Sequence, residues 1–310
     1  MENELITFWE YPEVQELYMI AGWQQWADAG AVSSGLPQYL IQKLGAKKIG
    51  ELKDADYYLF QLPGTHHFLR PEISLEDGLP KSLRKPVNEF YYVPHGNRGL
   101  VIFLGEEPHM RADTYCEALL TAVQMIGVQR VVAVGGVYGA MPYDREREIS
   151  CIYSLPPMKD ELSKYAVRFS NYEGGATIGT YLAEKAQQQE IEFVVLYAFV
   201  PAYDFSEVAH TLEALSIEHD FRAWYDLLRR IRHMFGLSLD LSELEEQSHE
   251  LMISMDAKLE ELDEELEDLD VHAYLDSISE EFDTKPFVPP LSDVWGKALD
   301  NLLKDEDQDE

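Results

Sequence analysis

Glu106, Glu107 and His109 form the first cluster of residues that could do chemistry. Carboxylates close to an imidazole can act as acid and base, or can supply ligands to a metal ion. The side chains of adjacent residues point apart in most backbones, so the two carboxylates need not share a site. This cluster alone does not define a reaction.

A second cluster, His66, His67 and Arg70, lies in a predicted loop over residues 63–80 and could bind an anion or a metal ion. Neighbouring histidines in a loop are also commonly solvated, and that alternative stays open. The sequence contains no GxxxxGK[ST] phosphate loop, no GxGxxG fingerprint, no GxSxG elbow, and no HExxH or paired CxxC metal motif. We therefore assign no catalytic residue, and we expect no metal and no cofactor.

Two apolar runs that end in glycine indicate the elements that would position such residues. Residues 100–104 and 131–134 are apolar without alternation, which is typical of strands buried on both faces. Between them, residues 118–126 carry apolar side chains at helical spacing. Two strands joined by a helix form a parallel βαβ unit, which we predict to be the centre of a sheet.

The same alternation continues on both sides of this unit. Residues 17–21 predict a strand, and the turn after it offers Asp28 as a cap for a helix that runs to about Leu44. Residues 177–189 predict a helix, and residues 193–199 predict a further buried strand. The fold class is therefore α/β, with a layered α/β/α domain over residues 1–205.

Ligands of open α/β sheets bind outside the carboxyl ends of the strands. Segments 22–28, 105–108, 135–138 and 201–203 would meet at this edge, next to residues 172–175. The candidate pocket residues are Gly22, Trp23, Asp28, Arg70, Gly105, Glu106, Glu107, Gly135, Gly136, Tyr138, Tyr172, Gly174 and Tyr203. Glycine N–H groups and a helix N-terminus would favour a polar or anionic ligand. The alternative is that the glycines only permit tight turns between strands and helices.

The charge of the chain limits its partners. With 25 Lys and Arg against 57 Asp and Glu, the formal net charge is −32, and a nucleic acid backbone would be repelled. Cys116 and Cys151 are the two cysteines, which indicates a reducing compartment rather than a disulfide scaffold. No signal peptide and no membrane-spanning apolar run is present, so we expect a cytoplasmic protein without a membrane partner.

The C-terminal quarter differs from the rest of the chain. From Asp240 onward it has 25 acidic and 4 basic residues, a net charge of −21. Apolar or small residues recur every three or four positions from Leu241 to Leu269, which predicts a long helix with a narrow apolar stripe. The stripe would pack on the chain itself, or it would contact a second chain through Leu244, Leu251, Met255, Leu259, Leu262 and Leu266. We expect a helical region over residues 206–283 and a flexible acidic tail over residues 284–310.

Six short motifs together resemble a known family. In chain order they are AGWQQWADAG (residues 21–30), Arg70-Pro71, FLGEEP (103–108), VAVGGVYGAMP (132–142), YEGGATIG (172–179) and VPAY (200–203). Their order resembles the prokaryotic branch of the proteasome assembly chaperone 2 family. The match spans residues 17–283, including the C-terminal helices of the longer bacterial members.

This resemblance implies a fold similar to that of nucleoside phosphorylases and peptidyl-tRNA hydrolases, generally in oligomers. By analogy with archaeal and eukaryotic relatives, it implies binding or assembly of 20S proteasome subunits rather than catalysis. Relatives that dock on the proteasome end in a hydrophobic residue, a tyrosine and any residue. This sequence ends in Asp307-Gln308-Asp309-Glu310, so we do not expect docking by such a tail, whereas contacts through a face of the fold remain open.

Two functions follow from these observations. The first is a non-enzymatic, self-associating protein with an assembly or scaffold role, whose partners are further copies of itself and proteasome subunits or another protein. The alternative is an enzyme or sensor that binds a nucleoside, a nucleotide or another small anion at the sheet edge. The positions of Asp28, Glu106 and Tyr138 separate these functions, because the enzyme or sensor would have all three side chains point into one cavity.

Overall fold

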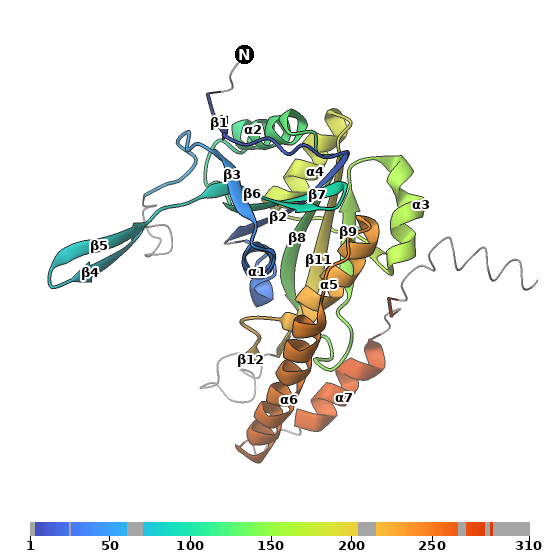
Figure 1. Cartoon of the computed structure of the whole chain (residues 1–310). Helices are drawn as coiled ribbons and strands as arrows, with labels where there is room; N and C mark the ends of the chain where they lie inside the picture. Colours follow the sequence, from blue (N-terminus) through green and yellow to red (C-terminus); the bar gives the residue numbers. More distant parts are fainter. Residues whose placement is uncertain are drawn as a thin grey trace, which may run out of the picture.

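A mixed ten-stranded sheet forms the centre of the computed structural model, which describes residues 4–24, 26–60, 71–203, 215–265, 271–282 and 286–287. The strands are β1 (Ile6–Phe8), β2 (Glu16–Gln24), β3 (Lys47–Leu52), β6 (Asn88–His95), β7 (Arg98–Glu106), β8 (Arg130–Gly139), β9 (Ile149–Tyr153), β10 (Arg168–Phe169), β11 (Glu192–Tyr203) and β12 (Leu215–Ser216). Their order is β1-β3-β6-β7-β2-β8-β11-β9-β10, with β12 paired to β11 (Figure 1). The predicted α/β class is confirmed.

The predicted central unit needs one correction, because β7 and β8 are not neighbours. Strand β2 lies between them and runs parallel to both, with Ile20 opposite Ile102 on one side and Val132 on the other. Strand β11 continues the parallel set beyond β8. All four strands are buried on both faces, as the unbroken apolar runs indicate.

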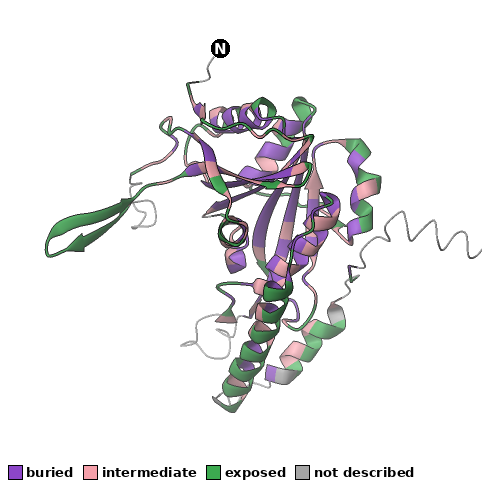
Figure 2. Ribbon diagram, in the orientation of Figure 1, coloured by how far each residue is buried: buried purple, intermediate pink, exposed green. Residues whose placement is uncertain are grey.

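Helices cover both faces of the sheet, which confirms the layered arrangement. The helices of the α/β part are α1 (Gly35–Leu44), α2 (Ala112–Met125), the short α3 (Lys159–Leu162) and α4 (Ile178–Gln188). Helices α2 and α4 form one core with alternate strand residues such as Met19 and Val131. Helix α1 and the C-terminal helices form the other core, with the intervening residues such as Ile20 and Val132. Figure 2 shows the strands between these layers as mostly buried.

The C-terminal extension is helical, with α5 (Phe221–Met234), α6 (Ser242–Glu265) and α7 (Val271–Glu281). Helix α5 packs on the sheet, and α6 extends from the body beside α7 (Figure 1). The helical pattern expected from residue 206 is wrong for residues 215–216, which pair with β11 as strand β12.

The apolar stripe of α6 lies against the chain's own helices. Leu244, Met255 and Leu259 are buried in the core that contains α5, and Leu251 and Leu262 are partly buried against it. Leu266 lies outside the described residues. The described part of the stripe, up to Leu262, therefore lies wholly or partly against the core that contains α5 and α7.

The expected loop over residues 63–80 is wrong for its second part. Strands β4 (Glu72–Glu76) and β5 (Leu79–Arg84) form an antiparallel hairpin that projects from the body (Figure 1). Asp77-Gly78 between alternating apolar residues is a strong hairpin signal, and the charged residues around it obscure the pattern. Residues 61–70, which include His66, His67 and Arg70, lie outside the described residues.

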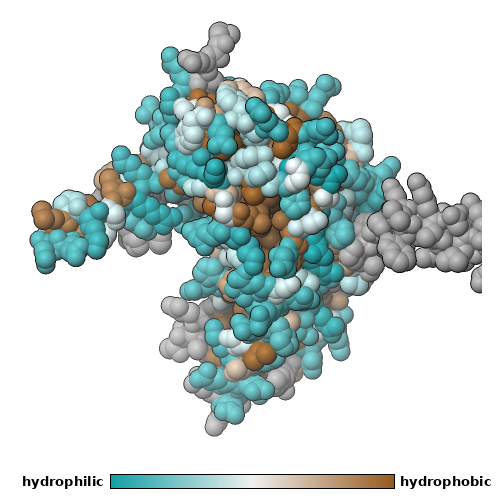
Figure 3. Space-filling model, in the orientation of Figure 1, coloured by the Kyte–Doolittle hydropathy of each residue, from teal (hydrophilic) through white to brown (hydrophobic). Residues whose placement is uncertain are grey.

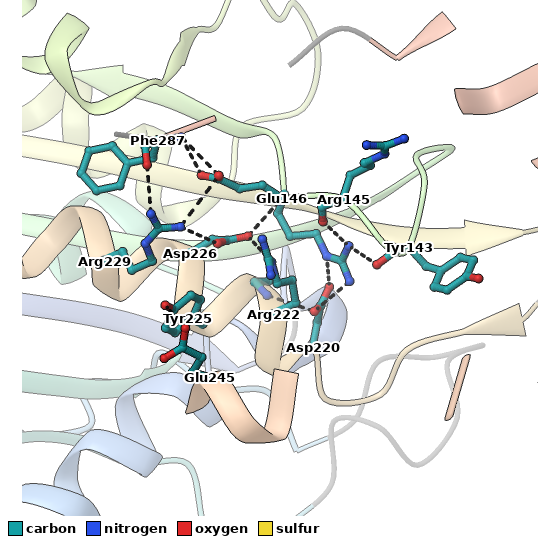
Figure 4. Close-up of polar contacts among 12 residues, drawn as sticks. Tyr143, Arg145, Glu146, Asp220, Arg222, Tyr225, Asp226, Arg229, Glu245 and Phe287 are labelled. Atoms are coloured by element: carbon teal, nitrogen blue, oxygen red, sulfur yellow. Dashed lines mark hydrogen bonds and ion pairs between the residues drawn. The ribbon is translucent and has the colours of Figure 1, made fainter. Parts of the chain in front are cut away.

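A buried ionic network holds the loop after β8 against α5 (Figure 4). Arg147 Nε lies 2.8 Å from Asp220 Oδ2, and both side chains are fully buried. The Arg147 backbone N–H donates to Asp226 on the next turn of α5 (2.9 Å). Glu146 accepts from Arg230 (2.8 Å) and from the backbone N–H of Phe287 (3.1 Å). The network therefore connects this loop, α5 and the segment after α7.

Candidate functional site

A cleft of about 730 Å³ opens at the carboxyl ends of the parallel strands, where the sequence predicts a site. Its walls come from the turn after β2, the ends of β8 and β11, strand β9 and the segment that leads into α4. The lining residues are Trp26, Ala27, Asp28, Ala29, Gly136, Val137, Tyr138, Ser150, Ile152, Ser170, Tyr172, Gly175, Thr177, Thr180, Tyr197 and Phe199. This volume lies within the range of about 300–1,000 Å³ of small-molecule sites.

The rim of the cleft is aromatic and exposed. The exposed fractions are 66% for Trp26, 54% for Tyr138 and 71% for Tyr172. They come from three segments far apart in the sequence, which the sheet brings to one edge. Exposed aromatic groups gathered at a concave surface mark sites of protein or ligand contact.

Hydroxyl groups supply the polar part of the cleft. Thr177 caps α4 by accepting from the backbone N–H of Thr180 (3.1 Å), and its hydroxyl also bonds to that of Tyr197. Burial raises the pKa of Tyr197 to about 12, so this phenol is neutral at physiological pH. Ser150, Ser170 and Thr180 add further hydroxyl groups to the lining. The interior is therefore polar but uncharged at these positions.

Asp28 is the only charged side chain among the described lining residues, and the chain itself uses its carboxylate. Its Oδ1 accepts from the backbone N–H groups of Ser33 (2.8 Å) and Ser34 (2.9 Å), and its Oδ2 accepts from the Ser34 hydroxyl (2.7 Å). Ser33 and Ser34 are the two residues immediately before α1, whose N-cap is Ser34, so Asp28 fixes the turn that leads into the helix and does not itself cap α1 as predicted. Burial raises the pKa of Asp28, against the lowering effect of these hydrogen bonds.

Two glycines allow the turn that carries Asp28 to approach the strand ends. A Cβ on Gly22 would lie 1.8 Å from the carbonyl oxygen of Ser33, and a Cβ on Gly136 would lie 2.0 Å from that of Ala29. The backbone N–H of Gly136 donates to Ala27 O (2.8 Å). The space where a side chain would lie at these two glycines is filled by the chain's own backbone. This agrees with the alternative that the glycines serve close packing of the turns.

Glu107 binds the backbone at the start of α4, much as Asp28 binds the turn before α1. Its Oε1 accepts from the backbone N–H of Ile178 at the start of α4 (2.9 Å). Burial raises the pKa of Glu107, while the N–H groups of Ile178 and Trp26 lower it. Because carboxylates already bind the starts of α1 and α4, neither presents an open anion site of the kind predicted.

Four predicted residues are not part of the cleft lining. Trp23 is buried and donates from Nε1 to the Tyr115 hydroxyl (2.8 Å), which donates to Asn88 (2.7 Å). Gly105 packs on Phe103 and Asn88. The remaining two are Gly135, against the Tyr197 ring, and Gly174, beneath the Tyr172 side chain.

Glu106 and Tyr203 also point elsewhere. The backbone carbonyl of Glu106 accepts from the Tyr58 hydroxyl (2.9 Å), and burial raises the pKa of its side chain. Tyr203 is buried, and its hydroxyl donates to Met141 O (2.7 Å). Asp28 and Tyr138 therefore share one cavity, and Glu106 does not line it.

The predicted acid/base cluster is divided by the fold. His109 Nδ1 accepts from the backbone N–H of Leu59 (3.0 Å), and burial lowers the pKa of this imidazole. Within the described ranges, no group of three His, Cys, Asp or Glu side chains could hold a metal ion. None of the helices in that part of the chain is long and apolar enough to cross a membrane.

Sequence reasoning missed half of the cleft wall. Ser150 and Ile152 lie on β9, which pairs antiparallel with β11 and brings them to the strand ends. No local pattern indicates that pairing. Trp26 carried a usable signal, because it stands beside Asp28 in a polar turn, where a large aromatic residue is unusual.

Comparison with known proteins identifies a family whose model matches this chain. The model of the PAC2 family matches residues 22–259. A PAC2 family protein from Streptomyces avermitilis is similar in structure, with 26% identity, a TM-score of 0.67, and coverage of 84% of this chain and 99% of that one. No curated protein matches the sequence.

Two further structures share the fold at lower identity. One is a proteasome-assembly chaperone homologue from Mycobacterium tuberculosis, with 23% identity, a TM-score of 0.68, and coverage of 83% of this chain and 99% of that one. The other is an archaeal proteasome activator from Pyrococcus furiosus, with 20% identity, a TM-score of 0.59, and coverage of 81% and 97%.

Proposed function

The chain belongs to the PAC2 family, and on this premise we propose that it is a non-enzymatic, self-associating assembly protein that binds apolar segments of partner proteins. Two structural neighbours, a proteasome-assembly chaperone homologue and a proteasome activator, suggest proteasome subunits as partners. The cleft at the strand ends is the surface that would bind them.

One observation carries this proposal: the cleft combines an exposed aromatic rim with charged groups that are already bound. Trp26, Tyr138 and Tyr172 are all more than half exposed. Asp28 accepts three hydrogen bonds from the start of α1. Aromatic side chains with few charges are the composition of the centre of protein interfaces. An apolar peptide segment fits such a surface better than a small anion does.

The polar groups of the cleft also favour binding over catalysis. Thr177 and Tyr197 bond to each other, and Thr177 also caps α4. A nucleophilic hydroxyl requires a base within hydrogen-bond reach that is free to take its proton. Asp28 is the one carboxylate in the described lining, and its oxygens accept from Ser33 and Ser34.

A small-molecule sensor is the second candidate, because the volume of about 730 Å³ suits a nucleoside-sized ligand. Its hydroxyl groups at Ser150, Ser170 and Thr180 would orient an uncharged polar ligand. The two candidates predict different occupants of the same cleft.

The test is affinity capture with purified proteasome α-type subunits and with native extract, using wild type and the variant Tyr138→Ser/Tyr172→Ser. The matched control is Tyr11→Ser, which removes an exposed tyrosine outside the cleft lining. We expect wild type and the control to retain a defined protein partner and the cleft variant to lose it. Equal capture by all three proteins would refute the proposal. A stoichiometric small molecule in the wild-type eluate, with no protein partner, would establish the sensor instead.

A further inference from the structure

The hairpin of β4 and β5 is exposed along its whole length. Every residue from 72 to 85, a segment that we call the arm, is exposed in the described structure. Four large apolar side chains lie in it: Ile73, Leu75, Leu79 and Leu83. Figure 1 shows the arm projecting away from the body, and Figure 3 shows apolar side chains along it and at its far end.

The two faces of the arm differ in character. Ile73 pairs directly with Leu83, and Leu75 follows Ile73 two residues later on the same face of β4. On the opposite face, Ser74 pairs with Ser82, and Glu72 pairs with Arg84, whose guanidinium lies 3.6 Å from the carboxylate. Beyond the register shift between Ser74 and Leu75, Leu79 pairs with Glu76 and so lies on the second face, near the tip. The arm therefore has one apolar face, with Ile73, Leu75 and Leu83, and one mainly polar face, and no described element covers either.

An apolar face of this kind requires a partner. An isolated two-stranded hairpin is at best marginally stable in water, and its open edges invite pairing with other chains. Here the strands contact chiefly each other, so the rest of the described chain contributes little to their stability. Burial of the apolar face against another surface would stabilise the hairpin and remove the exposed patch.

Charge indicates that a second copy of the chain can be this partner. The chain carries a net charge of −32, which opposes contact between two copies over most of their surface. The arm is balanced, with three acidic residues (Glu72, Glu76, Asp77) and three basic residues (Lys81, Arg84, Lys85). The described cleft lining has one charged residue, Asp28. Arm and cleft are thus two places where copies can meet without strong repulsion.

The position of the arm is compatible with a reciprocal contact between two copies. Arg84 at its base bonds to the Gln24 side chain at the end of β2, and Trp26 on the cleft rim lies two residues further along the chain. Arm and cleft therefore start from the same edge of the sheet. Two copies that face each other with this edge would each present an arm and a cleft to the other, which is the arrangement of a closed, two-fold contact.

We propose that the arm of one copy docks with its apolar face on the aromatic rim of the cleft in a second copy. The inference rests on the proposed function in one respect, namely that the cleft binds protein. In the oligomer without a partner protein, the arm occupies the surface on which a partner segment binds.

The first test measures mass by analytical ultracentrifugation from about 1 to 100 μM. The arm variant is Ile73→Asp/Leu83→Asp, and the matched control is Ser74→Asp/Ser82→Asp, which adds the same charge to the opposite face. We expect wild type and the control to be oligomeric and the arm variant to be monomeric, with at least a tenfold weaker association. Unchanged far-UV dichroism and melting temperature would show that the arm variant is folded. A monomeric wild type, or an arm variant with unchanged mass, would overturn the proposal.

The second test locates the contact by disulfide formation between differently tagged copies. One copy carries Leu75→Cys and the other carries Tyr172→Cys, and the native Cys116 and Cys151 are both buried. We expect a heterodimer that carries both tags under mild oxidation. A control pair of Leu75→Cys with Met125→Cys, an exposed site at the end of α2, is expected to give none. Equal cross-linking by both pairs would overturn the arm-to-cleft contact.

These tests separate this inference from the proposed function. A monomeric arm variant that still captures proteasome subunits would support both statements, because its cleft remains open. A Tyr138→Ser/Tyr172→Ser variant that loses the captured partner but keeps the wild-type mass would refute arm docking at the cleft and leave the assembly function intact. Oligomers that depend on the arm, without any captured partner, would support arm docking alone.

Discussion

The carboxylate of Glu107 accepts a hydrogen bond from the backbone N–H of Ile178, with 2.9 Å between Oε1 and N. This contact links the end of β7 to the start of α4, 71 residues later, and it forms behind the aromatic cleft. Glu107, which was predicted to line a ligand pocket, thus stabilises the wall of the cleft instead.

Glu107→Gln is expected to change how stability depends on pH. Burial raises the pKa of the Glu107 carboxyl in the folded state, so its favourable contribution is fully present below the unfolded pKa of about 4.3. That contribution is lost as the pH rises through the raised, folded-state pKa. The glutamine keeps an acceptor for Ile178 but cannot titrate. Relative to wild type, the variant should therefore gain stability between pH 4 and pH 7 in urea unfolding.

The control for Glu107→Gln is Glu117→Gln, an exposed glutamate of α2. It removes one charge of the same sign without a buried contact. Parallel pH curves for the two variants would contradict the prediction.

Arg147→Met is expected to lower the free energy of unfolding by roughly 3–5 kcal/mol, because it leaves the buried Asp220 without its counter-ion. The double variant Arg147→Met/Asp220→Asn should be less destabilised than the single variant. The asparagine is neutral and can still accept from the backbone N–H of Ala223 at the start of α5. Arg145→Met, at an exposed position of the same loop, should cost less than about 0.5 kcal/mol in the same denaturation experiment. A double variant as unstable as the single one would show that the lost charge pair is not the cause.

Leu259→Ala is expected to destabilise the packing of α6 on the core by about 2–4 kcal/mol, because Leu259 is buried in the apolar stripe. Ile253→Ala, on the exposed side of the same helix, should have an effect below about 0.5 kcal/mol. Hydrogen exchange of α6 and α7 amides measures this locally. Similar exchange rates in both variants would indicate that the stripe does not hold the extension in place.

Gly136→Ala is expected to cost at least about 1–3 kcal/mol, because its Cβ would lie 2.0 Å from the carbonyl oxygen of Ala29. Gly175→Ala provides the control, since no atom lies within 4 Å of its added Cβ. Both positions line the cleft, so a difference in melting temperature reports the packing of the turn after β2. Equal melting temperatures would show that this turn can move away from β8.

Neither cysteine should react in the native protein. Burial raises the pKa of Cys116 and of Cys151 to about 12, and both side chains are inaccessible. Titration with a chromogenic disulfide at pH 8 should find no thiol in native protein and two in guanidinium chloride. Rapid modification of the native chain would mean that one of the two cores opens at equilibrium.

The unbroken apolar runs determined the buried strands of the sheet, because a strand covered on both faces tolerates no alternating polar residues. Helical spacing with a glycine stop likewise located α2, whereas the helix cap predicted at Asp28 was wrong, because Asp28 binds the turn before α1 and Ser34 is the N-cap. These features depend on residues close together in the chain. The family, too, was recognisable from the order of short motifs.

Tertiary structure alone decided the strand order and the composition of the cleft. The pairing of β2 between β7 and β8, and of β9 with β11, depends on contacts between residues far apart in sequence, for which no local pattern exists. The same pairing brings Tyr138, Ser150 and Tyr172 to one surface and directs Glu107 to Ile178 instead. Sequence supplied the residue types at the sheet edge, whereas long-range packing determined which of them meet bulk solvent and which satisfy the backbone of the protein itself.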